Sequence, residues 1–386
     1  MIRVGVNLLW MVPGVVGGSE TYTTRLLQGL AESDIRDPEL EYRLFALPQF
    51  ATAHPDLASH FEVSYAPVTG QWKSFRVAGE NTWLARQTRE QSIHVLHHAG
   101  GIVPIIRTGR TVLTLHDLQY LFYPEYFTRT KLIYLKTMVP RSAESARLIL
   151  TPSEFTRRTV IERLNIDPSI VVTVPHGIAP RDDRVEDPDV RERFGIRGPF
   201  FLYPAATYPH KNHLVVIEAL AQLQRTHPDA SLVFTGPAAW KEWATAKQME
   251  QRLAQEISHL GLGDSVKRLG YVPERDLAAL YQEAIAVVFP SRFEGFGAPV
   301  LEGMSRGCAV VAANATAIPE VVGTCGILCS PDNAEEWAEA MRDLIEDEER
   351  RAQLGKAGRE RARQFEWTRS AEILERSYRS VMETTL

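Results

Sequence analysis

Cysteine is scarce in this sequence. Its 386 residues include only Cys308, Cys325 and Cys329, without a CxxC pair or a histidine spacing that would complete a zinc site. We therefore predict incidental thiols in a reducing compartment. No run of about 18 apolar residues could span a bilayer. Residues 1–9 lack the basic start of a signal peptide and are more typical of a buried strand. These absences predict a cytoplasmic location.

A strong excess of one charge is also missing. The formal net charge is -5, and a mildly acidic chain lacks the broad basic surface that sequence-independent nucleic-acid binding requires. Nucleic acid is therefore not an expected partner. At roughly 150 residues per domain, the length predicts two domains. The hydrophobic content of 44% is sufficient for two separate cores.

Short apolar runs alternate with helix-length amphipathic segments along the whole chain. Continuous β-branched strands separated by helices indicate parallel sheets covered on both faces, and so an α/β fold. The predicted strands are 3–9, 42–47, 94–97, 111–116, 147–151, 171–174, 200–205, 231–235, 265–269, 286–289 and 308–312. The predicted helices include 19–32, 131–146, 153–164, 214–226, 240–260, 274–283 and 299–305. From Glu335 onward the pattern predicts helix to the end, interrupted at 364–368.

One segment interrupts this alternation. Residues 175–199 hold four prolines, three glycines and a dense charge cluster, which is typical of a linker. We predict a first domain at 1–178, a second at 179–365, and a final helix at about 366–386 that crosses back to the first domain. Doubly wound domains bind ligands at the carboxyl ends of their strands, so we expect a ligand cleft between the two.

The first candidate binding loop is 14–20, between the first strand and a helix. Paired glycines at Gly17 and Gly18 would let backbone N–H groups approach a phosphate at a helix start, with Ser19 as the expected N-cap. A tight turn without a ligand is the alternative. The loop does not have the GxGxxG pattern, so a dinucleotide site is not indicated.

Two further loops in the second domain carry charged residues at a strand-to-helix junction. Lys211 could place a point charge on a phosphate, although a solvated lysine is the alternative. Gly295 and Gly297 could form a nest of N–H donors, and Pro299 suits a first helical turn. Glu294 and Glu302 on either side could accept hydroxyl donors; two glutamates that only favour the helix dipole are the alternative.

The segment Glu294-x7-Glu302, written EGFGAPVLE, resembles the EX7E motif of retaining glycosyltransferases of the GT4 type. Five further segments resemble the family in the same order: GGSE at 17–20, TLHD at 114–117, PHGI at 175–178, GYVP at 270–273 and PEVVG at 319–323. The resemblance covers nearly the whole chain. It implies the GT-B fold, in which two Rossmann-like, doubly wound domains face a cleft, the first binding the acceptor and the second the nucleotide-sugar donor.

The family's roles carry over only to matching positions. Glu302 is implied to bind the donor ribose, Glu294 the hydroxyls of the donor sugar, and Lys211 the diphosphate. His116 is implied to face the donor sugar from the first domain. Further implied donor contacts come from the backbone of Tyr271 and Val272 at the base, from the N–H groups of Phe296, Gly297 and Ala298, and from the space beside Gly17 and Gly18.

The sequence departs from the family at three positions. Many members have an arginine beside this lysine or six residues before it, where this chain has His210 and Ala205. Arg292 is a candidate replacement. Ala298 stands where many members have leucine, which changes the shape near the donor sugar. No cluster has metal-ligand spacing, so we expect neither a metal nor another cofactor.

The implied reaction transfers a hexose from a nucleotide-diphosphate sugar, with GDP-mannose or a dTDP- or UDP-hexose favoured, to a saccharide or a lipid-linked acceptor. Retention by front-face attack is implied; a double displacement would need Glu294 as nucleophile. The alternatives are a nucleotide-sugar 2-epimerase of the same fold and a non-catalytic nucleotide-sugar binder. The oligomeric state stays open.

Two other features have competing interpretations. Residues 126–147 mix basic and apolar side chains and could contact an acidic membrane surface peripherally, or could form an ordinary helix with a solvated basic side. The pair His97 and His98 could ligate a metal, but histidines of a core or cleft are the favoured interpretation.

Overall fold

The computed structural model describes residues 1–33, 37–178, 187, 189–236 and 244–383. The contacts within the chain divide it into two units, each with its own core. Unit 1 comprises Met1–Ala179 and Phe365–Leu386, and unit 2 comprises Pro180–Gln364. The expected boundaries lie within one residue of these. No helix among the described residues is long and apolar enough to cross a membrane.

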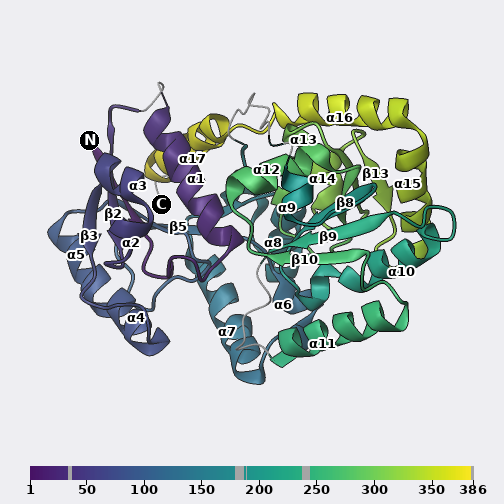
Figure 1. The fold of residues 1–386 in the computed structure, drawn as a ribbon. Coiled ribbons are helices and arrows are strands. Elements are labelled where there is room, and N and C mark those ends of the chain that lie inside the picture. The colour runs from purple at the N-terminus through teal and green to yellow at the C-terminus, as the bar shows by residue number, and fades with distance from the viewer. Residues whose placement is uncertain (34–36, 179–186, 188, 237–243, 384–386) are drawn as a thin grey trace. The chain divides into compact units, whose positions relative to one another are not determined.

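Unit 1 is built on a seven-stranded parallel sheet with the order β3-β2-β1-β4-β5-β6-β7 (Figure 1). The strands are β1 Ile2–Asn7, β2 Leu40–Ala46, β3 Glu62–Tyr65, β4 Val95–His98, β5 Arg110–Thr114, β6 Leu148–Thr151 and β7 Val171–Thr173. Its helical elements are α1 Gly18–Glu32, α2 Phe50–Ala53, α3 Pro55–His60, α4 Lys73–Gly79, η1 Glu80–Leu84, α5 Ala85–Glu90, α6 Gln119–Phe122, η2 Pro124–Tyr126, α7 Arg129–Ser145, α8 Glu154–Leu164, η3 Pro168–Ile170 and α17 Trp367–Glu383.

Unit 2 is built on a six-stranded parallel sheet with the order β10-β9-β8-β11-β12-β13. The strands are β8 Phe200–Pro204, β9 Ser231–Thr235, β10 Val266–Gly270, β11 Ala286–Phe289, β12 Ala309–Ala313 and β13 Ile327–Cys329. Its helical elements are α9 Val190–Arg193, η4 Pro209–Lys211, α10 His213–Leu223, α11 Ala244–His259, α12 Glu274–Glu283, α13 Ala298–Ser305, α14 Ile318–Val322, α15 Ala334–Glu346 and α16 Glu348–Ala362.

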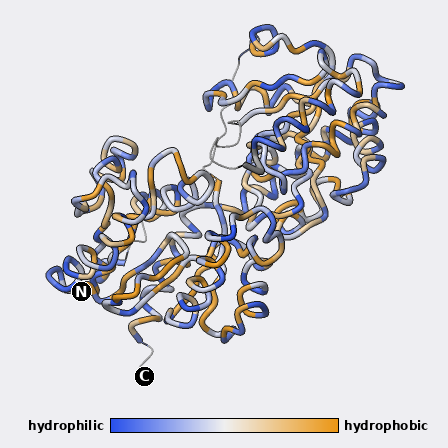
Figure 2. Tube along the Cα trace, turned by 90° about the horizontal axis from the view of Figure 1, so that it is seen from below, coloured by the Kyte–Doolittle hydropathy of each residue, from blue (hydrophilic) through white to orange (hydrophobic). Residues whose placement is uncertain are grey.

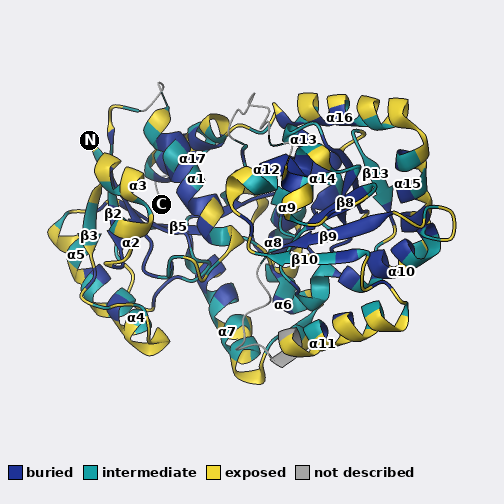
Figure 3. Ribbon diagram, viewed as in Figure 1, coloured by how far each residue is buried: buried dark blue, intermediate teal, exposed yellow. Residues whose placement is uncertain are grey.

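Burial explains why both sheets form from these sequences. Strands β4, β6, β9, β11 and β12 are buried at every residue, and the flanking helices expose one side to solvent (Figure 3). The hydropathy of the trace follows the same division, with hydrophobic strands and helices that alternate in character (Figure 2). This is the pattern of doubly wound α/β units, as predicted.

The predicted elements differ from the structure in a few places. Strands β3 and β13 were not expected; β3 has the sequence EVSY at the sheet edge and its end residues are exposed, so it has no apolar run. The expected continuous helix after Glu335 is also broken at Asp347, whose side chain accepts the N–H of Arg350 and so begins α16. The N-cap of α1 is Gly17 rather than Ser19, because the positive φ of 69° at residue 17 ends the preceding loop. Residues 240–243 of the helix expected at 240–260 lie outside the described residues.

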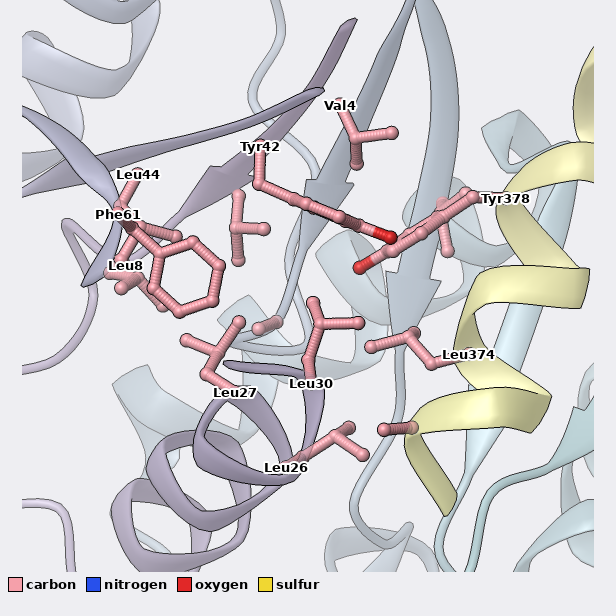
Figure 4. Close-up of a cluster of buried hydrophobic side chains, with 14 of the residues drawn as sticks. Val4, Leu8, Leu26, Leu27, Leu30, Tyr42, Leu44, Phe61, Leu374 and Tyr378 are labelled. Atoms are coloured by element: carbon pink, nitrogen blue, oxygen red, sulfur yellow. The ribbon is translucent and has the colours of Figure 1, made fainter. Parts of the chain in front are cut away.

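The last helix completes the core of unit 1. Leu374 and Tyr378 of α17 lie with Leu26 and Leu30 of α1 in one buried cluster (Figure 4). Gly29 allows this approach, because a Cβ there would lie 2.7 Å from the carbonyl oxygen of Trp367. The crossing of the C-terminal helix back to the first domain is therefore confirmed.

Candidate functional site

In unit 2 the sheet has a switch point between β8 and β11, since the connections from these two neighbours lead in opposite directions. The carboxyl ends of all strands in a parallel sheet lie at one edge, and ligands bind such folds at this position. The turn η4 follows β8 and the loop 290–297 follows β11. The candidate residues Lys211 and Glu294 thus flank the switch point.

A direct ion pair joins these two residues. The Lys211 Nζ lies 2.6 Å from Glu294 Oε1, and the two side chains are only 16% and 13% exposed. The same ammonium lies over the ring of Phe289, 5.3 Å from its centroid. An ammonium held among a carboxylate and an aromatic face is largely removed from water, so its field acts strongly on any neighbouring charge.

Hydrogen bonds from neighbouring loops hold this pair in place. The Tyr203 hydroxyl donates to the carbonyl of Lys211, and the N–H of Glu294 donates to Thr316 Oγ1 over 3.0 Å. The N–H of Arg292 donates to the carbonyl of His210 over 2.8 Å. Tyr203 and Thr316 were not foreseen, because a single hydrogen-bonding side chain on a distant element carries no motif.

Glu302 is oriented by a second tyrosine. It lies in α13, the helix that begins directly after this loop, and its Oε2 accepts a hydrogen bond of 3.0 Å from the Tyr281 hydroxyl. Burial, together with the neighbouring Glu302 carboxylate, raises the pKa of Tyr281 well above its usual value. The phenol therefore stays protonated and continues to donate to Glu302. Tyr281 is likewise a residue that the sequence did not reveal.

The start of α13 has the expected backbone. Gly297 is the N-cap with φ of 102°, a conformation that glycine adopts without strain, and Pro299 lies in the first turn. Ala298 is the first helical residue, and Phe296 is buried. The N–H groups at the start of a helix generally bind anions, and here they follow Glu294 in the chain by a few residues.

Tyr271 and Val272 lie at another loop of the same sheet edge, after β10. Tyr271 is 81% exposed and Val272 is buried, and Pro273 then caps α12, the helix that supplies Tyr281. These two residues make no described contact with Lys211, Glu294 or Glu302. Through α12 they precede Tyr281 in the chain by about ten residues.

The missing family arginine has no evident replacement. The Arg292 guanidinium is paired with Asp332, with Nε 2.7 Å from Oδ1. His210 cannot supply a positive charge, since burial and the neighbouring Lys211 hold its pKa well below the usual value. The described contacts thus place the Lys211 ammonium at the switch point.

The described residues contain no group of three or more His, Cys, Asp or Glu side chains that could hold a metal. An Asp-x-Asp triplet is a common metal-binding pattern, and the sequence contains one at 187–189. Asp187 accepts two hydrogen bonds from Arg193 and so takes part in an ion pair within the protein. His97 and His98 are buried. His97 is 2.7 Å from both Tyr378 and Thr114, and His98 is 3.2 Å from Asn7. They are core histidines, as favoured.

The candidate residues of unit 1 lie around its own switch point, between β1 and β4. A Cβ added to Gly17 or Gly18 would meet no atom within 4 Å, so open space borders the loop after β1. Glu20 holds this loop: its Oε2 accepts the N–H of Gly14 over 2.9 Å, and its Oε1 is 3.0 Å from His54 Nε2.

His116 follows β5 and lies among aromatic rings. Its Nε2 is 2.9 Å from the carbonyl oxygen of Ala99, which only accepts, so Nε2 carries the proton. The ring is 5.3 Å from Tyr22 and 6.2 Å from Trp10. Burial lowers the pKa of His116 to about 4, so this histidine is neutral near pH 7.

The likeness to known proteins agrees with this geometry. The pattern of the family described as Glycosyltransferase Family 4 matches residues 16–182, and that described as Glycosyl transferases group 1 matches residues 187–361. The O-antigen chain mannosyltransferase B of Escherichia coli is 30% identical over 294 residues, which is 74% of this chain and 73% of the relative. The chain belongs to this glycosyltransferase family.

Other relatives extend the comparison. A D-inositol 3-phosphate glycosyltransferase of Corynebacterium aurimucosum is 27% identical over 85% of this chain and 74% of its own length. The structure of Anabaena Alr3699/HepE in complex with UDP and glucose superposes with a TM-score of 0.75 at 22% identity, over 98% of this chain and all of that one. The lipopolysaccharide glycosyltransferase WaaG gives 0.68 at 16% identity, over 97% and 98%. These likenesses show the GT-B fold.

Proposed function

We propose that this glycosyltransferase moves a hexose from a nucleotide-diphosphate sugar to a saccharide or lipid-linked acceptor, with retention of the anomeric configuration. The observation that carries the proposal is the Lys211–Glu294 pair of 2.6 Å at the switch point of unit 2, followed by the helix start at Gly297. A cation and a row of N–H dipoles at one sheet edge suit a diphosphate leaving group.

Each residue has a defined part in the proposal. Breaking the glycosyl–phosphate bond leaves negative charge on the departing diphosphate, and the Lys211 ammonium stabilises that charge. Glu294 orients Lys211 in the free protein and accepts hydroxyl donors of the sugar when the donor is bound. Glu302, held by Tyr281, accepts the two ribose hydroxyls. In this assignment Glu294 binds and orients, and the acceptor attacks the anomeric carbon from the face the diphosphate leaves.

The donor sugar is proposed by analogy with relatives. Names of related proteins include a mannosyltransferase acting in O-antigen chains, and a structural neighbour was solved with UDP and glucose. We accordingly favour mannose or glucose as the hexose, carried by GDP, UDP or dTDP, and a role in surface-polysaccharide synthesis. Unit 1, with open space beside Gly17 and Gly18, is the proposed acceptor side.

The proposal is tested by supplying GDP-mannose, UDP-glucose and dTDP-glucose in turn, with EDTA present, and measuring nucleoside diphosphate release. Release that requires a saccharide acceptor, with an α-linked product from an α-linked donor, is expected. Release accompanied by a rearranged free sugar and no acceptor would instead identify a 2-epimerase. Nucleotide binding without release under every condition would identify a non-catalytic binder, and activity abolished by EDTA would contradict metal independence.

A further inference from the structure

One surface of unit 1 combines exposed large apolar side chains with cations and plays no part in the site described above. It is formed by α4 with its preceding residue, the loop 103–107, and α7; we call it the basic apolar surface. Trp72, Phe75, Ile105 and Ile133 are 68%, 63%, 67% and 67% exposed. Isolated exposed apolar residues are ordinary, but four this large within three connected elements need an explanation.

Described contacts connect the three elements. The Lys73 ammonium of α4 lies over the ring of Tyr134 in α7, 5.0 Å from its centroid. The loop joins both helices at a second place: the N–H of Ile105 donates to Asn81 Oδ1 just after α4, and Arg141 of α7 donates to the carbonyl of Val103. The exposed side chains therefore lie on three elements that contact one another. In Figure 1, α4 and α7 both lie at the lower edge of unit 1, and Figure 3 shows exposed residues on each.

The charge of this surface is mainly positive although the whole chain carries a net charge of -5. Residues 72–79, 103–107 and 129–145, which form this surface, contain one acidic residue, Glu144, and the neighbouring Glu80 and Asp117 interact electrostatically with Arg76 and Lys131. The three elements contribute seven cations: Lys73, Arg76, Arg107, Arg129, Lys131, Lys136 and Arg141. The Arg141 guanidinium donates to the neutral carbonyls of Val103 and Ile105, so these bonds fix its position without cancelling its charge.

We propose that the basic apolar surface binds the face of a lipid bilayer that contains anionic headgroups, with Trp72, Phe75 and Ile133 inserted at the level of the headgroups. Charge complementarity selects the occupant, because basic residues near an anionic bilayer each add to binding. Tryptophan and phenylalanine beside lysine and arginine are typical of interfacial segments, whereas protein interfaces have few lysines at their centres. Bilayer binding would also bring unit 1 to a lipid-linked acceptor, and this part of the inference rests on the proposed function. Bilayer binding itself is independent of the proposed function.

The test is co-sedimentation of the full chain with phosphatidylcholine vesicles, with or without phosphatidylglycerol. Binding is expected only to vesicles with phosphatidylglycerol, and it is expected to weaken in high salt. The double variant Lys73→Glu/Lys136→Glu should bind at least about tenfold more weakly, and Trp72→Ser/Phe75→Ser should bind more weakly in high and low salt alike. All four positions are exposed in the structure, so these variants should fold.

Matched controls lie elsewhere on the chain. Lys356→Glu/Arg363→Glu makes the same charge change on exposed residues of α16 and the turn after it in unit 2, and Tyr65→Ser removes an exposed aromatic ring from β3. Wild-type binding by all controls is expected. Equal affinity for both vesicle types, no vesicle binding, or wild-type binding by the charge-reversal variant would overturn the proposal. Vesicle binding is measured without donor, so a failure to bind vesicles would not contradict the proposed transfer reaction. A failure to bind nucleotide in calorimetry would contradict the proposed transfer reaction but not the bilayer contact.

Discussion

In unit 2, the loops at the switch point hold an ammonium and a carboxylate 2.6 Å apart, with both side chains mostly buried. In unit 1, the corresponding loops hold glycines beside open space, and the carboxylate there, Glu20, accepts the N–H of Gly14 and lies 3.0 Å from His54. The nearby His116 has its pKa lowered to about 4 and is neutral near pH 7. The sheets have the same parallel architecture, so the fold does not decide this difference. The comparison teaches that one architecture can place an ammonium at the switch point of one unit and a neutral histidine beside open space in the other, according to a few loop residues.

The largest effect is expected from removing the ammonium of unit 2. Lys211→Ala should lower kcat by roughly 10² to 10³-fold with a smaller change in KM, because the charge that Lys211 stabilises develops in the transition state. Steady-state kinetics, with the donor that supports nucleotide release in the assay described above, measure these two constants. Lys356→Ala is the control: Lys356 is an exposed lysine of α16 outside the site, so its loss should change kcat little. An effect of Lys211→Ala confined to KM would contradict the assigned role.

The second test concerns ribose binding in unit 2. Glu302→Ala should weaken nucleotide binding by about 10- to 100-fold, since charged hydrogen bonds contribute roughly 1.5–3 kcal/mol. Tyr281→Phe, which removes the 3.0 Å hydrogen bond that orients Glu302, should weaken it less. Titration calorimetry with the nucleoside diphosphate measures both, with the exposed Glu360→Ala as the control. Unchanged affinity in Glu302→Ala would refute the ribose assignment.

Acid should act on unit 1 through its histidines. Burial lowers the pKa of His97, His98 and His176 to about 3 and that of His116 to about 4, against an unfolded value near 6.5. Above pH 6.5 each of these histidines is neutral in the folded and in the unfolded protein. As the pH falls from 6.5 towards the folded pKa, only the unfolded protein binds the proton, so the free energy of unfolding decreases by up to about 1.4 kcal/mol per pH unit for each histidine.

The measurement is urea denaturation between pH 7 and pH 5. The midpoint should fall with pH, and His176→Gln should show a shallower dependence than the wild type. Gln71→Ala is a control on the same unit: Gln71 is exposed and does not titrate, so the slope should not change. A midpoint that is constant from pH 7 to pH 5 in the wild type would contradict neutral histidines in this core.

The smallest effects are expected from alanine substitutions at Gly17 and Gly18 of unit 1. Gly17 has φ of 69°, so Gly17→Ala should destabilise the protein by about 1 kcal/mol. Gly18 has neither a positive φ nor a neighbour within 4 Å of an added Cβ, so Gly18→Ala should leave the melting temperature unchanged. If the space is used by a substrate, Gly18→Ala should nevertheless raise a KM. Wild-type kinetics in Gly18→Ala would show that nothing binds against that loop.

The sequence predicted the architecture well because buried parallel strands have a strong signal. Strands such as β11 and β12 are apolar at nearly every position and were found within one residue of their bounds. Strand β3 was missed, since its edge position leaves both end residues exposed and its pattern polar.

The candidate site was predictable only in part. The topology of a parallel sheet predicts that Lys211 and Glu294 follow neighbouring strands. Their ion pair could not be predicted, because it joins residues 83 positions apart and depends on how the side chains are placed. Tyr281 and Thr316 act by single hydrogen bonds from other elements, and no local pattern identifies such partners. The ion pair of Arg292 with Asp332, 40 positions away, could not be predicted for the same reason, and the role of Arg292 stays a prediction.

The return of α17 to unit 1 has a consequence for synthesis on the ribosome. Unit 2 supplies the 185 residues 180–364 between the two parts of unit 1, which at about 5–20 residues per second take roughly 10 to 40 s to translate. During that interval Leu30 and Tyr42, which α17 covers in the finished protein, lack their partner helix. The unit that emerges first from the ribosome is therefore the last to be completed.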